Sequence, residues 1–524
     1  MKIFHGPIVT CDWEGSVCSY LVEEEGKIIY TGDRLPDPYS EIDENVKFIE
    51  LGRRALLPAF GDGHIHFSMW ALFNSTFDVR SAASLAEIAE IIKNYADSDP
   101  GIKIIFGFGH SEHSVQEKRL ITRAELDRVV KDRPVALIRY DGHSAVLNTR
   151  AIGLLPDRIR SRRGFDLEKG HVSSEAFLQG SNYITAKLPA TRIFSSLLQG
   201  IDTLAGYGVG LVHTTEGVGY RRDLDVDLVR FVARSSPVQI RTYFQTMDLD
   251  KVHRRNLPRV GGCFACALDG AFGTKDAALV TPYTDNEQNF GTLFYRDEEV
   301  IDFVSAANRA GLQVQLHCAG DAAVNQAVKA IATALKDYPR PDHRHTLIHA
   351  PLIPERTLEQ IAELGIGITI QPGFMVSPLE PPAYLETLLG ERIRYIWPLK
   401  KLLSMGINVS GGSDGPVNQP DPLTGIYGAC NHYFPEYSAG ISDALSMYTY
   451  HIAHTSFDEK ERGSLEEGKA ADLVVLNRNP LELEPKVLDQ LRVENIYLAG
   501  EAYSGGKSIP RAIIEGLKNR HGPA

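Results

Sequence analysis

The stretch LLPAFGDGHIH, residues 56–66, is a short apolar run that ends in two histidines one residue apart. A run of this length, bounded by glycines, is typical of a buried β-strand. Side chains at positions i and i+2 of a strand point to the same side, so His64 and His66 can reach one metal ion. Pairs of this kind also occur in ordinary cores and on surfaces, so the motif gains meaning only if other strands supply further ligands.

The rest of the chain supplies more strands, and the later ones are separated by helical patterns. Including 55–66, the strand candidates number eight, and helical spacing of apolar residues covers 298–309, 322–338, 355–364 and 394–405. Alternating strands and helices of this kind predict a (β/α)8 barrel. The other seven strand candidates are 208–215, 238–245, 264–269, 312–317, 345–349, 365–371 and 407–414.

Further donors stand at the ends of the later strands. Alternation within 312–317 points His317 into the barrel, His349 ends the next strand, and Asp414 ends the last one. Catalytic residues of such barrels lie at the carboxyl ends of several strands. His64, His66, His317, His349 and Asp414 therefore form a candidate site for one divalent ion, preferably Zn²⁺, with Fe²⁺ or Mn²⁺ as alternatives.

The two ends of the chain have a different sequence pattern from the middle, typical of short β-strands and turns. We expect a small β-sandwich made of residues 1–56 and 463–524, with the barrel at 57–462. The gap between the first two barrel strands is too long for a single crossover, so residues from about 70 to 195 are predicted to be an insertion on the barrel rim. The insertion includes a helix that begins with the capping pattern Ser84 and Glu87.

Composition narrows the class of partner. The chain has 524 residues, a net charge of −12 and six cysteines. It has no basic block, no apolar run long enough to span a membrane and too few cysteines for a disulfide framework. We therefore expect a cytoplasmic protein with a small-molecule substrate, with neither nucleic acid nor membrane as partner. The sequence leaves a homo-oligomer open.

Eight segments together resemble the metal-dependent hydrolases of the amidohydrolase superfamily. The resemblance is to the branch of large members with a long first insertion, similar to N-substituted formamide deformylase-like proteins. It implies a (β/α)8 barrel with a β-sandwich from both termini, and a metal held by the five residues named above. The segments are LLPAFGDGHIH (56–66), RPVALIRYDGHSAVLN (133–148), LDGAFGTKDAALVTPY (268–283), VQLHCAGDAAV (314–324), RHTLIHA (344–350), ITIQPGF (368–374), SGGSDGPV (410–417) and GSLEEGKAADLVVLN (463–477).

One departure from the family pattern concerns the number of metal ions. Many relatives carry, four residues before the position of Asp269, a lysine that becomes carboxylated and bridges two metals, and here that position is Ala265. We therefore expect a single ion. Cys263 and Cys266 are conceivable substitutes as thiolate ligands, although ordinary buried cysteines are the preferred interpretation. Lys275 is an alternative that could reach in from the following loop.

The implied chemistry is hydrolysis of a carbon–nitrogen bond other than a peptide bond, in an amide or a cyclic amide. Asp414 would take a proton from metal-activated water and return it to the leaving nitrogen, and His349 would either bind the metal or donate to the substrate. His143 matches a family position, and with Lys275 it is a candidate substrate-binding residue. Two alternatives remain open. One is deamination of an aminoheterocycle, although Gly320 stands where such deaminases carry a glutamate, and the other is a non-catalytic scaffold.

Overall fold

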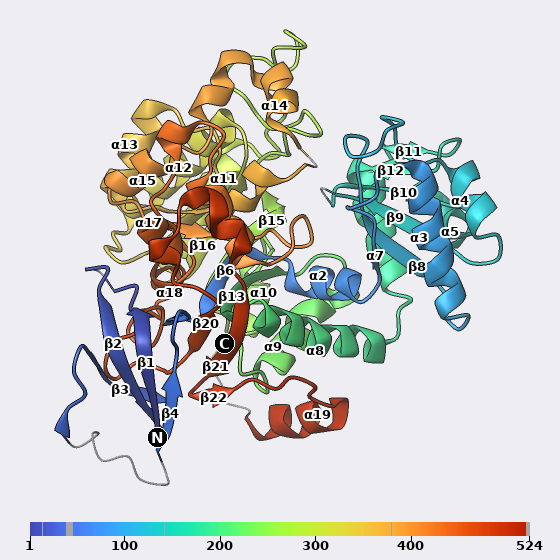
Figure 1. Cartoon of the computed structure of the whole chain (residues 1–524). Helices are drawn as coiled ribbons and strands as arrows, with labels where there is room; N and C mark the ends of the chain where they lie inside the picture. Colours follow the sequence, from blue (N-terminus) through green and yellow to red (C-terminus); the bar gives the residue numbers. More distant parts are fainter. Residues whose placement is uncertain (13, 38–45, 141, 379, 520–524) are drawn as a thin grey trace.

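A closed ring of parallel strands forms the centre of the molecule (Figure 1). The structure is a computed structural model that describes residues 1–524 except 13, 38–45, 141, 379 and 520–524. Within these residues each barrel strand pairs in parallel with the next one along the chain. The strands are β6 (Phe60–Ile65), β13 (Val209–Glu216), β14 (Gln239–Phe244), β15 (Arg259–Ala267), β16 (Gln313–Cys318), β17 (Thr346–His349), β18 (Gly367–Ile370) and β19 (Val409–Gly411).

The ring closes where its first and last strands meet. The backbone N–H of Asp414 donates to the carbonyl of His64 at 2.8 Å, and the N–H of His66 donates to Gly415 at 2.9 Å. Ile65 and Gly415 form a parallel bridge at the same place. Closure satisfies the hydrogen-bonding groups that two edge strands would otherwise expose. The predicted barrel is confirmed.

Helices cover the outside of the barrel because each carries one apolar face. In α12 (Asp321–Asp337), Val324, Val328 and Ile331 recur at helical spacing and are almost completely buried. Fully burying one such side chain stabilises the fold by about 1.5–3 kcal/mol. The other covering helices include α8 (Ala190–Gly206), α9 (Leu224–Ala233), α10 (Leu249–Arg254), α11 (Asp297–Arg309), α13 (Glu355–Leu364), α15 (Leu399–Ser404), α17 (Ile441–Met447) and α18 (Tyr450–Thr455).

Both ends of the chain contribute to a second sheet, as expected. Its order is β22-β21-β20-β5-β1-β2-β3, and β4 pairs with β1. The strands are β1 (Lys2–Val9), β2 (Val17–Glu24), β3 (Lys27–Gly32), β4 (Lys47–Glu50), β5 (Ala55–Pro58), β20 (Leu473–Leu476), β21 (Val493–Leu498) and β22 (Glu501–Ala502). The final helix, α19 (Ile509–Lys518), packs on α8 and α9. The domain boundaries at 56 and 463 remain proposals.

A third sheet, ordered β11-β12-β10-β9-β8-β7, lies between the first two barrel strands in sequence and beside the barrel in space (Figure 1). Ser84 caps α3 by accepting a hydrogen bond from the Glu87 N–H at 3.2 Å. The elements of this region are α2 (Phe67–Asn74), β7 (Phe77–Asp78), α3 (Leu85–Ser98), β8 (Ile105–His110), α4 (Arg123–Val129), β9 (Val135–Arg139), β10 (Ser144–Leu147), α5 (Thr149–Leu154), α6 (Asp157–Arg160), β11 (Phe165–Asp166), β12 (His171–Ser173) and α7 (Ser174–Thr185).

The fourth barrel strand differs from the prediction. We expected it at 264–269, but β15 begins at Arg259. Its register with β16 pairs Gly262 with Leu316 and then Ala267 with His317, so residues 263–266 form a bulge. At Gly261 a Cβ would lie 1.9 Å from the carbonyl oxygen of Gln315, so only glycine permits this approach of the two strands. The predicted strand therefore started five residues too late and left out the glycine pair.

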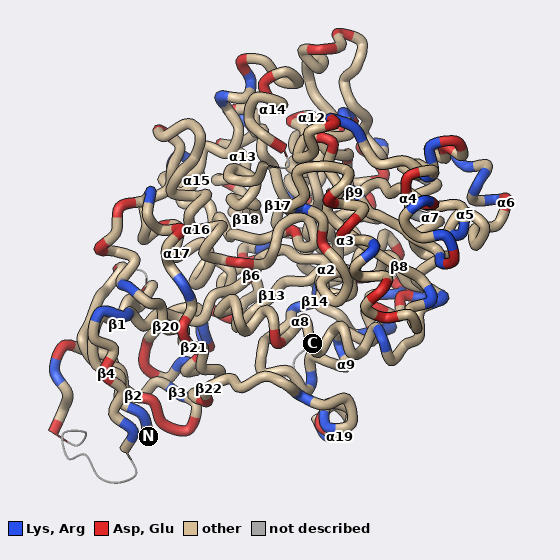
Figure 2. Tube along the Cα trace, turned by 45° about the vertical axis from the view of Figure 1, so that its right-hand side comes forward, with Lys and Arg blue, Asp and Glu red and all other residues tan. Residues whose placement is uncertain are grey.

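The surface carries charges of both signs. Acidic and basic residues are interspersed along the described chain, and neither sign forms one continuous stripe over it (Figure 2). Among the described residues, no helix combines the length and apolar character that crossing a bilayer requires.

Candidate active site

The five side chains predicted from the sequence meet at the carboxyl ends of the barrel strands. Asp414 Oδ1 lies 3.2 Å from His64 Nε2 and 3.3 Å from His66 Nε2. On the other side, the rings of His317 and His349 lie with their centroids 4.6 Å apart, and His349 is 5.7 Å from His64. All five are buried. Positions up to 350 residues apart in the chain (His64 and Asp414) thus form one compact cluster.

Cys263 occupies the centre of this cluster. Its Sγ is 3.3 Å from His64 Nε2, 3.3 Å from His317 Nδ1 and 3.7 Å from His349 Nε2. Cys263 is buried, as expected, but it lies among the donors, because the bulge sets this residue at a height that regular strand spacing does not predict. Cys266 does belong to the hydrophobic core, as expected.

Ala265 stands in place of the lysine that bridges two metals in many relatives. It lies in the bulge, and its carbonyl accepts a hydrogen bond from the Tyr295 hydroxyl at 2.7 Å. The expectation of a single ion stays a prediction, and Cys263 lies between the two groups of donors.

Hydrogen bonds on the outer nitrogens orient two of the histidines. His349 Nδ1 lies 2.6 Å from Gln371 Oε1, which requires a proton on Nδ1 and leaves the lone pair of Nε2 facing Cys263. His317 Nε2 donates to the carbonyl of Gly270 at 3.0 Å, so its Nδ1 faces the centre. Such partners fix the tautomer of metal-binding histidines.

Backbone geometry at the strand ends supports the cluster. His349 has φ 69° and Asp414 has φ 56°, which is the left-handed region that non-glycine residues rarely adopt. Each such residue costs about 1–3 kcal/mol and persists where surrounding structure enforces it. Backbone N–H groups of His64 and Ser413 both donate to buried Asp62, at 3.1 and 3.0 Å, and this carboxyl ties the two strand ends together.

The electrostatics of the cluster suit a cation. Burial lowers the pKa of His64 to about 4 and that of His317 well below its ordinary value, so both imidazoles are neutral at pH 7. Burial opposes ionisation of Asp414, but hydrogen bonds from His64 and His66 outweigh it and hold the pKa of this carboxyl well below its usual range. Buried imidazoles thus surround one carboxylate.

The donors form two overlapping groups that share one residue. His64, His66, Cys263 and Asp414 form the first, and Cys263, His317 and His349 form the second, with ligand atoms in each group within 4.8 Å of one another. Imidazole, thiolate and carboxylate are the ligands of Zn²⁺ and related divalent ions. The residues present fit one such ion in each group.

A cavity opens over the cluster. His143, His317, His349 and Asp414 line it, so the predicted substrate residue His143 does reach the site. Aromatic walls complete it, provided by Tyr140, Phe272, Phe374 and Trp397. Lys275 is not among the lining residues. Its ammonium pairs with Asp285 at 2.5 Å on the exposed side of the loop, although Phe272 and Gly273 just before it line the cavity.

Two neighbours of the cluster were missed by the sequence analysis. Gln371 directly follows β18, at the end of the strand predicted at 365–371, but no sequence signal linked it to His349. Thr215, whose Oγ1 lies 3.1 Å from His66 Nδ1, ends the second strand. Position at a strand end was the only available indication for either residue.

Known proteins match the chain over most of its length. A family model described as "Amidohydrolase family" matches residues 47–503. The chain belongs to the amidohydrolase family. It is 26% identical to YtcJ of Bacillus subtilis (strain 168) over 95% of this chain and 98% of that protein. It is 23% identical to N-substituted formamide deformylase of Arthrobacter pascens, over 95% and 97% respectively.

A solved structure from Pyrococcus furiosus, described as an uncharacterized metal-dependent hydrolase, has the same fold. It is 28% identical, with a TM-score of 0.75, and the match covers 92% of this chain and all of that one. The resemblance found in the sequence is confirmed, and so is the class of enzyme: this amidohydrolase is a hydrolase of carbon–nitrogen bonds other than peptide bonds.

Proposed function

We propose that this amidohydrolase cleaves the carbon–nitrogen bond of small open-chain amides, with N-substituted formamides as the first class to test. The observation that carries the proposal is the convergence of His64, His66, Cys263, His317, His349 and Asp414 at the floor of one cavity. The relative named for formamide deformylation supports the choice of substrate class.

We further propose two bound divalent ions, preferably zinc, with the Cys263 thiolate shared between them. His64, His66 and Asp414 would complete one site, and His317 and His349 the other. Ions bound there would lower the pKa of a water molecule and polarise the substrate carbonyl. This replaces the single ion expected from the sequence, because the expectation depended on Ala265 alone.

Asp414 is the proposed proton carrier. Its carboxylate is ionised at neutral pH and borders the cavity, so it can accept a proton from the attacking water and deliver it to the departing nitrogen. Its left-handed backbone fixes the carboxylate at the mouth of the cluster.

His143 is the proposed donor to the substrate oxygen. The sequence offered His349 for this role, but His349 directs Nε2 to Cys263 and Nδ1 to Gln371, so neither nitrogen faces the substrate. His143 lines the same cavity from the insertion. A donor aimed at the developing oxyanion typically contributes about 2.7–4 kcal/mol to transition-state stabilisation.

Deamination is the weaker alternative. The position of the deaminase glutamate is Gly320, and a Cβ there would lie 1.9 Å from the carbonyl oxygen of Ala278. No side chain fits at this position without displacing backbone, so the acid that would carry protons to an aminoheterocycle has no place here.

The test is a screen of formamides, N-acyl amines, cyclic ureas and aminoheterocycles for released amine, carboxylate or ammonia. We expect amine release from at least one open-chain amide, and loss of at least about 10³-fold in kcat/KM for Asp414→Asn. Asp321→Asn is the matched control, since Asp321 accepts from the Val280 N–H outside the cluster. Ammonia released only from heterocycles would contradict the proposal.

A further inference from the structure

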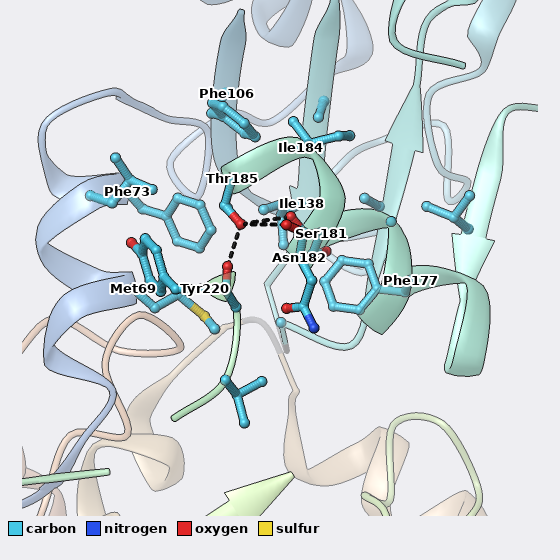
Figure 3. Close-up of a pocket in the computed structure, with 18 of the residues that line it drawn as sticks. Met69, Phe73, Phe106, Ile138, Phe177, Ser181, Asn182, Ile184, Thr185 and Tyr220 are labelled. Carbon is cyan, nitrogen blue, oxygen red and sulfur yellow. Dashed lines mark hydrogen bonds between the residues drawn. The ribbon is translucent and has the colours of Figure 1, made fainter. Parts of the chain in front are cut away.

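A second cavity, which we call the lateral chamber, lies between the barrel and the insertion. Its walls include Met69, Phe73, Phe106, Ile138, Phe177 and Phe264. Figure 3 shows side chains of α2 and α7 facing each other across this space. Its free volume is about 60 Å³, on a measure by which one water needs about 10–15 Å³. It therefore has room for a small group of heavy atoms.

The chamber shares a wall with the catalytic cavity. The Phe264 ring lines the chamber, and its centroid lies 5.2 Å from the ring of His66 and 5.5 Å from that of His143. Gly142 lines the chamber and the next residue, His143, lines the catalytic cavity. The Phe264 ring thus stands between the chamber and the His66 side of the donor cluster.

The bulge that centres Cys263 also places Phe264. A phenylalanine at φ 50° is a conformational outlier for a bulky residue, and it directs the ring away from the strand ladder toward the insertion. One local distortion therefore serves both the donor cluster and the wall of the chamber.

The lining is apolar but includes unpartnered polar atoms. Tyr220 is 8% exposed. Its hydroxyl and Asn182 Oδ1 are buried without a hydrogen-bond partner among the described residues. Asn182 extends from α7 toward the space in Figure 3. An unsatisfied buried polar group costs about 1–3 kcal/mol, and a ligand atom could relieve that cost.

We infer that the lateral chamber receives a compact apolar substituent of the substrate, a single ring or a short branched chain, that carries one polar atom. The inference rests on the proposed amide hydrolysis and specifies its substrate class. An apolar wall beside the scissile bond favours such substrates over those with a methyl group, because burial of the substituent removes apolar surface from water.

The first experiment measures binding, independent of turnover, to metal-depleted protein. N-Cyclohexylformamide and N-methylformamide are titrated calorimetrically into wild type, Ala145→Leu and Val146→Ile. Ala145 faces the chamber and Val146 packs in the core on the opposite side of β10. We expect Ala145→Leu to weaken cyclohexyl binding at least about tenfold and Val146→Ile to change it less than about twofold. Equal affinities in wild type and Ala145→Leu would overturn the inference.

The same variants are then assayed for kcat/KM. Loss of cyclohexyl binding in Ala145→Leu supports the proposed role of the chamber, whether or not wild type hydrolyses the formamides. If wild type hydrolyses neither formamide, only the proposed function is contradicted. Turnover of both formamides with unchanged preference in Ala145→Leu would defeat the chamber and leave the proposed function intact.

Two further variants guard against a folding defect. Met69→Ala enlarges the chamber, and we expect binding of N-(1-adamantyl)formamide to improve at least about tenfold. A 4-hydroxycyclohexyl probe should bind about 2–10-fold more tightly than cyclohexyl, and Tyr220→Phe should abolish that difference. If Met69→Ala does not bind the adamantyl compound more tightly than wild type, the apolar part of the inference is contradicted. If wild type does not prefer the hydroxylated probe, the polar part is contradicted.

Discussion

Replacing Cys263 with alanine tests the centre of the metal site directly. The Sγ atom lies within 3.7 Å of three imidazole nitrogens, drawn from both donor groups. Its removal should therefore weaken both ions at once, whereas loss of any single histidine removes a ligand from one group only. Cys266→Ala is the matched control, since Cys266 is equally buried three residues away and packs in the hydrophobic core.

The size of the effect follows from ligand count. Removing a residue that only hydrogen-bonds a metal ligand lowers the affinity for the metal about 10–100-fold. Loss of a ligand itself is therefore expected to lower that affinity at least about 100-fold, which is about 2.7 kcal/mol per ion. Ions that bind only the folded state stabilise it by the same amount that their binding changes. The stabilisation by metal should thus fall by about 5 kcal/mol in Cys263→Ala and remain unchanged in Cys266→Ala.

The assay combines metal analysis with urea unfolding in the presence and absence of zinc. Without zinc, both variants should lose about 1 kcal/mol for the deleted buried sulfur. With zinc, wild type and Cys266→Ala should carry two ions, and Cys263→Ala fewer than one after dialysis. The reasoning is refuted if Cys263→Ala retains two ions and the full zinc-dependent stabilisation.

Three further predictions follow from other contacts. Gln371→Leu, which removes the partner of His349 Nδ1, should weaken zinc about 10–100-fold in competition with a chromophoric chelator, and unchanged affinity would contradict the orienting role. Asp458→Asn breaks the buried pair with Arg241 and should lower the free energy of unfolding by about 3–5 kcal/mol, whereas Glu299→Gln, in an exposed pair with Arg296, should leave it nearly unchanged. Burial opposes ionisation of Asp458, but hydrogen bonds from Arg241 outweigh it and hold the pKa of this carboxyl below its usual range. The carboxylate therefore stabilises the fold at pH values above the unfolded-state pKa of about 3.9. This stabilisation is lost as pH falls through the lower folded-state pKa. Unfolding midpoints measured across acid pH should therefore fall more steeply in wild type than in Asp458→Asn, and parallel curves would count against the assignment.

Sequence reasoning succeeded where local pattern determines structure. Apolar strands separated by amphipathic helices predicted the barrel, and alternation within 312–317 pointed His317 inward because a strand has a period of two. The capping residue Ser84 was identified for the same reason, since its hydrogen bond depends on neighbours three residues away.

Sequence reasoning failed where the pairing of strands that are distant in sequence determines the local structure. Nothing in Gly261-Gly262 alone reveals that their neighbour is the backbone of Gln315, so the strand start and the bulge were missed and Cys263 was assigned to the core. Lys275 was misplaced for a similar reason, because its salt bridge to Asp285 depends on the path of a loop. Gln371 was placed on the correct strand, but its partner comes from another one.

The hydrogen bond between the Asp414 and His64 backbones places the donor cluster where the first and last strands of the barrel meet. Asp414 and the HxH pair are separated by almost the whole barrel in sequence. An ion bound by both would therefore cross-link the first and last strands, and it could bind only after all eight strands have assembled. Uptake of metal during refolding would consequently report completion of the entire cylinder, and a chain cut before residue 414 should remain unable to acquire it.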